Sequence, residues 1–153
     1  THLTNSVLTF SDLITNRKTD YKFDLEKFTN VNGKTGIYIQ YSQVRAKKLK
    51  DTIKNQSKEI KELILNKTDK QLLSKLFLFS HYLEQSALLN EPHHLANYLY
   101  EISNLFNQFY EKEKLTSITD PNQIASKLYI IDLFLTTSHN TMFCLGILPV
   151  DKM

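Results

Sequence analysis

The stretch DPNQIASKLYIIDLFLTTSHNTMFCL, residues 120–145, predicts a long helix with a well-defined start. Asp120 offers an N-cap acceptor, and Pro121 suits the first helical position because its missing N–H has no partner there. Gln123 stands where a capping box needs it. Apolar residues then recur at the helical period, at Ile124, Leu128, Ile131, Leu135, Met142 and Leu145. Gly146 is expected to end this helix in a left-handed cap.

The same period extends to most of the chain. Two more long amphipathic helices are expected, one through Leu72, Leu76, Phe79 and Leu83 and one through Leu95, Leu99, Ile102, Phe106 and Phe109, with Pro92 in the first turn of the second. A fourth should run from about Thr35 to about Asn55 after a turn at Asn32–Gly33, and a shorter one from about Leu8 to Thr15. Three glycines and three prolines are too few for a fold of many tight turns. The sequence therefore predicts an all-α fold, a single bundle of five or six helices, in one domain over residues 1–153.

Composition indicates a compact domain that needs no covalent staple. A chain of 153 residues buries about 68–70% of its unfolded surface on folding. The one cysteine, Cys144, excludes an internal disulfide and is expected to be a small buried apolar residue. No signal peptide or membrane span is visible. We expect a soluble, cytoplasmic protein, and its formal charge of only +3 predicts neither a membrane nor a DNA partner.

Motifs for catalysis, cofactor binding and metal binding fail on spacing. Gly33-Lys34-Thr35 looks like the end of a phosphate-binding loop, but that loop needs a glycine where Phe28 stands. The five histidines are scattered, and the adjacent His93 and His94 are expected to point in different directions. We therefore expect no catalytic residue, no cofactor and no metal on this chain.

The segment GKTGIYIQYSQVR, residues 33–45, favours RNA binding. On a helix, Tyr38, Tyr41 and Arg45 form one stripe. Aromatic faces stack on unpaired bases and arginine pairs with phosphate, so the stripe predicts a single-stranded RNA contact. The alternative is a packing face whose core side holds Ile37 and Val44. Spacing alone leaves both open.

Basic residues are concentrated after this stripe. Between positions 45 and 70 stand Arg45, Lys47, Lys48, Lys50, Lys54, Lys58, Lys61, Lys67 and Lys70, against Asp51, Glu59, Glu62 and Asp69. This excess could hold RNA phosphates, or it could be a solvated helix face. No single lysine is assigned as a site.

Four blocks resemble the C-terminal anticodon-binding domain of arginyl-tRNA synthetases, the DALR domain. They are residues 8–24, which begin LTFSDL, residues 36–45, residues 92–110, which hold PHHLANYLYE and FNQFY, and residues 145–153, LGILPVDKM. They follow the family's order over nearly the whole chain. The sequence departs from the family at Lys127, where the last long helix often has arginine.

The resemblance implies a set of tRNA-binding residues. In the family, residues at these positions hold unstacked anticodon bases, reach the anticodon loop, supply a positive charge or end the domain. The matching residues of this sequence are Tyr38, Tyr41, Arg45, Asn107, Tyr110 and Met153. Each also has a structural alternative. Tyr41 and Tyr110 could be half-buried core residues, Arg45 could form a structural salt bridge, and Asn107 an inter-helix hydrogen bond. Met153 could be a frayed end.

The resemblance also implies that catalysis lies elsewhere. The family's catalytic domain carries the class I signatures HIGH and KMSKS, which are absent here. The chain starts at Thr1 without methionine, so we expect a piece of a longer protein, with residues 1–24 leading in from an absent catalytic domain. That parent enzyme would use ATP and magnesium to arginylate arginine tRNA, whose middle anticodon base, a cytosine, matters most in this family. This chain alone should be inactive, and its partners should be arginine tRNA and the catalytic domain.

Two competing hypotheses remain at this point. One is a helical protein-interaction module that docks through the Tyr38 stripe and the Tyr98–Tyr100 region. The other is the anticodon-binding bundle of another class I synthetase, such as the cysteinyl enzyme.

Overall fold

The structure is a computed structural model that describes the chain except residues 1, 21, 23, 57–59, 61 and 113–116. The described residues are helical and contain no strand. The helices are α1 (His2–Ile14), α2 (Leu25–Phe28), α3 (Gly36–Ile53), α4 (Lys67–Leu76), α5 (Phe79–Leu89), α6 (His93–Lys112) and α7 (Pro121–Cys144), with a 3₁₀ turn at Lys54–Gln56. Apart from the single turn α2, that is six helices, which confirms the predicted all-α bundle.

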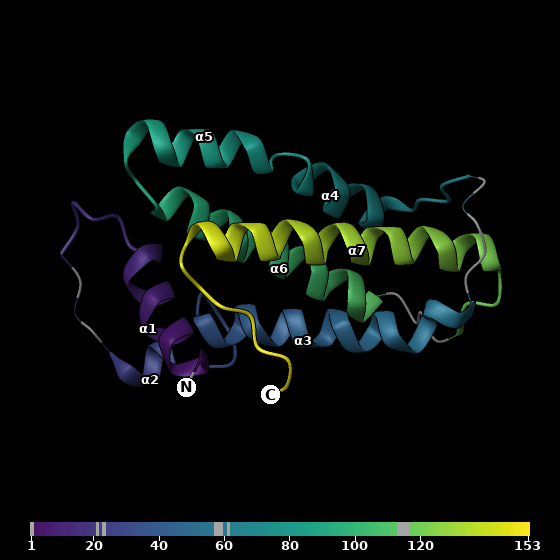
Figure 1. Cartoon of the computed structure of the whole chain (residues 1–153), viewed down its shortest axis with the longest axis horizontal. Coiled ribbons are helices and arrows are strands. Elements are labelled where there is room, and N and C mark those ends of the chain that lie inside the picture. Colours follow the sequence, from purple (N-terminus) through teal and green to yellow (C-terminus); the bar gives the residue numbers. More distant parts are fainter. Residues whose placement is uncertain (1, 21, 23, 57–59, 61, 113–116) are drawn as a thin grey trace.

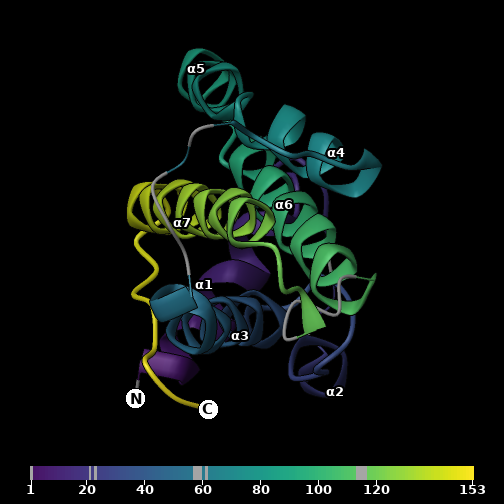
Figure 2. The same cartoon turned by 90° about the vertical axis from the view of Figure 1, so that its right-hand side faces the viewer.

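The three longest helices, α3, α6 and α7, pack against one another at the centre (Figure 1). Helix α1 packs on α3 and α6, and α4 packs on α6 and α7. Helix α5 contacts α6 and lies at the outer edge of the molecule, which Figure 2 shows along the long axis of the bundle. The last residues cross α3, and both chain ends lie on the same side of the bundle in both views.

One apolar core joins these helices. Phe106 of α6 and Phe134 of α7 stack with their ring centroids 4.2 Å apart, and Phe109 is also fully buried. Both phenylalanines belong to the apolar period that predicts this amphipathic helix, and their burial confirms that its apolar side faces the core. On α3 the core side consists of Ile39, Ala46, Leu49 and Ile53. Ile37 and Val44 are only partly buried, so placing them on the core side was wrong.

Capping residues in the sequence determine several helix ends. The Asp120 carboxylate accepts a hydrogen bond from the Asn122 N–H at 2.9 Å, and Pro121 opens α7, as predicted. The Thr35 hydroxyl caps α3 by accepting from the Tyr38 N–H. Gly146 has a φ of 70°, which confirms the left-handed cap after α7. These local signals fix both ends of α7 and the start of α3.

The predicted helix through Leu72 and Leu83 is wrong, because it is two helices, α4 and α5. The break falls at Phe77 and Leu78, where no proline or glycine stands. The Leu76 carbonyl accepts a hydrogen bond at 3.0 Å from the hydroxyl of Tyr98, which is fully buried on α6. A side chain from another helix thus takes the carbonyl that would continue α4.

Helix α1 begins at His2, earlier than predicted, and the short α2 was not predicted. Cys144 is exposed, so its predicted burial was wrong. It is the last residue of α7, at the end of the helix that also exposes Phe143. Met142 and Leu145 on either side of it are buried in the core, so Cys144 lies on the side of the helix end that faces away from the core.

A buried ion pair links α4 to α7. Lys127 Nζ lies 2.8 Å from both carboxylate oxygens of Asp69, and both side chains are almost fully buried. Asp69 also completes a capping box with Asn66 at the start of α4. Lys127, where the family often has arginine, is therefore a structural residue of the bundle.

Within the described residues, none of the helices carries an apolar stretch long enough to cross a bilayer.

Candidate nucleic-acid interface

Helices α3 and α6 bring five of the six predicted site residues together. Tyr38, Tyr41 and Arg45 lie on α3, whereas Asn107 and Tyr110 lie on α6, more than sixty positions later in the sequence. A hollow of about 290 Å³ beside them is lined by Val31, Asn32, Tyr38, Tyr41, Arg45, Asn107 and Glu111. We call this region, with Tyr110, the Tyr41–Arg45 surface.

Arg45 is the centre of this surface. Its guanidinium carbon lies 4.4 Å from the ring centroid of Tyr41 and 4.4 Å from that of Tyr110. The cation is therefore held between two aromatic rings on neighbouring helices. Both rings remain more than a third exposed, at 36% for Tyr41 and 37% for Tyr110. Each tyrosine is thus about two-thirds buried, a degree of burial that the half-buried alternative also expects.

Hydrogen bonds fix the arginine in this place. Arg45 donates to the Tyr41 hydroxyl at 2.6 Å and to Asn107 Oδ1 at 3.1 Å. Asn107 in turn donates to the Ser42 hydroxyl at 2.8 Å, so it forms the inter-helix hydrogen bond that was one of its two predicted roles. A fork of N–H donors held in a fixed orientation suits a phosphate or a base edge. The two rings and two hydrogen bonds therefore hold the planar guanidinium of Arg45 in one orientation.

Charge at this surface is only partly balanced. Glu111 Oε1 lies 3.7 Å from Arg45, but its side chain is 70% exposed. An exposed ion pair of this length is weak. A structural salt bridge therefore does not account for the position of Arg45, whose closest partners are the two rings and two neutral oxygens.

Tyr38 is more deeply placed than the other tyrosines. Its ring centroid is 5.6 Å from that of Tyr100, and its hydroxyl donates to Asn104 Oδ1 at 3.2 Å. Burial raises the pKa of the Tyr38 phenol. Tyr38 thus lines the hollow and also packs on the core. Its role in RNA binding stays a prediction.

Met153 lies apart from these five residues. It belongs to the C-terminal segment that crosses α3, and it is exposed.

The lysines that follow Arg45 differ in whether they form ion pairs. Lys47, Lys50 and Lys54 form ion pairs with Asp151, Asp132 and Asp51. Lys48 is exposed, and Lys58 and Lys61 are outside the described residues.

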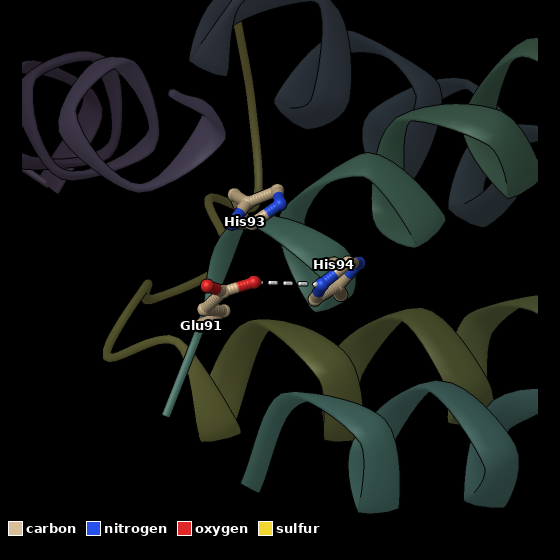
Figure 3. A group of neighbouring side chains, drawn as sticks. All are labelled: Glu91, His93 and His94. Carbon is tan, nitrogen blue, oxygen red and sulfur yellow. Dashed lines mark hydrogen bonds and ion pairs between the residues drawn. The ribbon is translucent and has the colours of Figure 1, made fainter. Parts of the chain in front are cut away.

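Glu91, His93 and His94 gather at the start of α6, as Figure 3 shows. Their possible ligand atoms lie within 4.8 Å of one another, and the two imidazole centroids are 4.1 Å apart. The prediction that the histidines diverge was wrong, because side-chain rotation lets adjacent rings approach each other at this partly buried helix start.

The surroundings of this cluster do not favour a metal ion. Lys18 Nζ lies 2.7 Å from Glu91 Oε1, and His94 Nε2 lies 3.1 Å from the other oxygen. Burial and the neighbouring His94 lower the pKa of His93. A cation would meet the Lys18 ammonium and the positive end of the α6 dipole. The absence of a metal remains a prediction.

Tyr98 is fully buried, with its ring stacked on Tyr82 at 4.8 Å between centroids. It therefore cannot belong to an exposed docking surface, and that part of the protein-interaction hypothesis was wrong.

A sequence model of the DALR anticodon binding domain matches residues 39–153. The chain belongs to this family. The match begins within α3 and takes in Tyr41, Arg45 and the α6 residues of the Tyr41–Arg45 surface.

Relatives of this DALR domain chain are named arginine–tRNA ligase. The one from Streptomyces coelicolor is 32% identical over 149 residues, which cover 94% of this chain and 25% of the relative. The one from Francisella tularensis subsp. novicida is 35% identical over 123 residues, or 75% of this chain and 21% of the relative. The chain thus spans about a quarter of the length of these relatives.

Solved structures support the same fold. The arginyl-tRNA synthetase of Thermus thermophilus superposes with a TM-score of 0.87 at 20% identity, over 99% of this chain and 26% of that one. The arginyl-tRNA synthetase of Plasmodium falciparum gives a TM-score of 0.83 at 24% identity, over 99% of this chain and 27% of that one. The fold of this DALR domain is therefore similar to that of these two synthetases even though at most 24% of the aligned residues are identical.

Sequence reasoning missed two features of the surface. The spacing of Tyr38, Tyr41 and Arg45 predicts their stripe, but it does not show that Tyr110 covers the other face of Arg45. It also did not single out Asn32 and Val31, which come from the loop before α3. The turn expected at Asn32–Gly33 was the only local signal for that loop.

Proposed function

We propose that this chain is the anticodon-binding domain of an arginine–tRNA ligase and that it holds the anticodon loop of arginine tRNA on the Tyr41–Arg45 surface. The observation that carries the proposal is Arg45 fixed between the exposed rings of Tyr41 and Tyr110. Unstacked loop bases can stack on such rings, with about 1–3 kcal/mol for each base. The arginine fork can pair with the phosphate between them.

The remaining parts of the activity would belong to the parent enzyme. Its catalytic domain would use ATP and magnesium to activate arginine, and it would be this domain's partner within the same polypeptide. Residues 1–24 would lead in from it. Because tRNA is charged in the cytoplasm by enzymes of this family, we also propose that the protein acts there.

The test is binding of this chain to three RNAs at low and high salt. These are arginine tRNA, the same tRNA with its middle anticodon base changed, and cysteine tRNA. We expect affinity to fall steeply with salt, because phosphate contacts release counterions, and to fall again when the middle base is changed.

Other outcomes would redirect the assignment. Salt-sensitive binding that ignores the base would mean a general RNA-holding domain. Tighter binding to cysteine tRNA would favour the cysteinyl alternative. No binding of any of the three would contradict the proposal and favour the protein-interaction module.

A further inference from the structure

One buried side chain, Gln40 of α3, hydrogen-bonds the C-terminal segment to the bundle. The Gln40 amide donates to the Leu148 carbonyl at 2.7 Å, and its oxygen accepts from the Val150 N–H at 3.0 Å. The same amide group donates to the Ser6 hydroxyl of α1 at 2.7 Å. Gln40 is fully buried. These three hydrogen bonds join α3 to the last residues of the chain and to its first helix.

This arrangement is specific for a primary amide. An amide carries two N–H donors and an acceptor oxygen, and here both donors and the oxygen are used. An apolar side chain of similar size would leave the Leu148 carbonyl and the Val150 N–H without these partners, and buried unpaired groups are costly. The segment beyond Leu145 has no helix of its own to hold it.

An ion pair and a hydrogen bond from Lys47 hold the C-terminal segment farther along α3. Lys47 Nζ lies 2.9 Å from the Asp151 carboxylate and 3.4 Å from the Val150 carbonyl. Beyond it, Asp151 and Lys152 line a hollow of about 420 Å³ together with Val44, Lys47, Lys48, Asp51 and Thr52 of α3. The end of the chain therefore lies next to Lys48 and Thr52.

Those two positions continue the stripe of the Tyr41–Arg45 surface. Tyr41, Arg45, Lys48 and Thr52 are spaced by four, three and four residues on α3, which places them on one side of the helix. An RNA strand that follows this stripe away from Arg45 meets Lys48 and then the end of the chain. Lys48 and Lys152 both offer exposed positive charge there.

We propose that Gln40 is a positioning residue for RNA binding. It contacts no RNA itself, and it fixes residues 148–150 so that Lys152 and Met153 lie alongside Lys48 as a second contact for the RNA strand. This inference rests on the proposed function, and what it adds is the assignment of Gln40 as the residue that orders the C-terminal segment on the binding surface.

The first test compares Gln40→Leu with Gln43→Leu. Both glutamines are fully buried on α3, but the oxygen of Gln43 accepts from Ser138 of α7 and not from the C-terminal segment. We expect Gln40→Leu to speed hydrogen exchange at the Val150 amide and to weaken binding of arginine tRNA about tenfold. Gln43→Leu should leave the Val150 exchange rate and the RNA affinity close to those of the unchanged chain.

A second measurement separates positioning from general destabilisation. In a chain that ends at Pro149, Val150 and the proposed RNA contacts Lys152 and Met153 are gone, so Gln40→Leu should cause no further loss of affinity. A loss of equal size in the full and shortened chains would show a merely structural role and overturn the proposal. Equal RNA affinity of Gln40→Leu and the unchanged chain would overturn it as well.

The outcome also distinguishes this proposal from the proposed function. If the unchanged chain binds no RNA, both fail. If the unchanged chain binds arginine tRNA and Gln40→Leu binds it equally well, only the positioning role fails.

Discussion

Arg45 shows what one side chain contributes to this surface that a simple positive charge would not. Its planar group lies between two rings and donates to two oxygens at once. Lysine carries the same charge but has neither the planar face nor the fork. The arrangement is therefore sensitive to shape as well as to charge.

At this position we expect Arg45→Lys to weaken RNA binding about two- to thirtyfold, as the cation–π contacts and the fork are lost. Unfolding free energy should fall by about 1–2 kcal/mol, because the Arg45 side chain is only 18% exposed and loses its contacts with both rings. The measurements are RNA titration and urea unfolding. Arg17→Lys is the matched control, because Arg17 is exposed outside the Tyr41–Arg45 surface. Equal losses for the two variants would contradict the role given to Arg45.

The Lys127–Asp69 pair makes a different residue-scale prediction. Lys127→Met should lower the unfolding free energy by about 3–5 kcal/mol, because it leaves the buried Asp69 carboxylate without its cation. The double variant Lys127→Met with Asp69→Asn should be less damaging than Lys127→Met alone. Urea unfolding measures both. A single variant as stable as the unchanged chain would show that the pair is not buried as described.

Residue-level signals in the sequence predicted part of the surface. The spacing of Tyr41 and Arg45 is local, so the helical period alone places them together. Tyr110 and Asn107 join them from α6 through tertiary packing, which local spacing does not encode. Only the resemblance to the family brought those two into the prediction.

Helices α1 and α3 approach each other closely because Gly36 has no side chain. A Cβ built on Gly36 would lie 2.5 Å from the Ser6 carbonyl oxygen of α1. Local sequence does not predict this crossing, because Ser6 lies thirty positions before Gly36 in the chain. Helix α1 was nevertheless expected, because its apolar residues repeat at the helical period.

For this crossing we expect Gly36→Ala to lower the unfolding free energy by about 1–3 kcal/mol, the usual cost of forcing extra volume into a packed contact. Thr52→Ala, an exposed change on the same helix, should stay within about 0.5 kcal/mol. Urea midpoints provide the comparison. If Gly36→Ala proves neutral, α1 is not in close contact with α3.

The break between α4 and α5 shows the limit of element prediction from periodicity. Leu72, Leu76, Phe79 and Leu83 keep the helical spacing across the break, so the pattern predicts one helix. The interruption comes from the Tyr98 hydroxyl on the Leu76 carbonyl, a contact between helices that are distant in sequence. By contrast, the start of α7 was predicted correctly because Asp120 and Pro121 act locally.

Protonation of two partly buried histidines couples the stability of the whole bundle to pH. Burial lowers the pKa of His139, which faces Lys47 and Asp151, and burial with the nearby His94 lowers that of His93. Both ordinary values are 6.5. A histidine with a lowered pKa in the folded chain binds protons more readily when unfolded, so its contribution is present above that value and lost below it.

The unfolding free energy should therefore fall as the pH drops below about 6.5. His139→Gln should make this decline shallower, because one of the two histidines no longer titrates. Urea unfolding at several pH values between neutral and mildly acidic measures both slopes. Stability that rises as the pH falls through this window would contradict the burial of these side chains.

The central claim for the molecule is that a helical bundle presents stacked aromatics and a fixed arginine to the anticodon loop. The most direct measurement is the affinity of an arginine anticodon stem-loop for the unchanged chain, Tyr41→Ala and Tyr129→Ala at low and high salt. Tyr129 is as exposed as Tyr41, at 39% against 36%, but lies on α7.

The account predicts that affinity falls with salt and that Tyr41→Ala weakens binding by about 1–3 kcal/mol, roughly five- to 150-fold. Tyr129→Ala should bind like the unchanged chain. Equal affinity of the two variants, or binding that does not respond to salt, would contradict an anticodon-binding role for this surface.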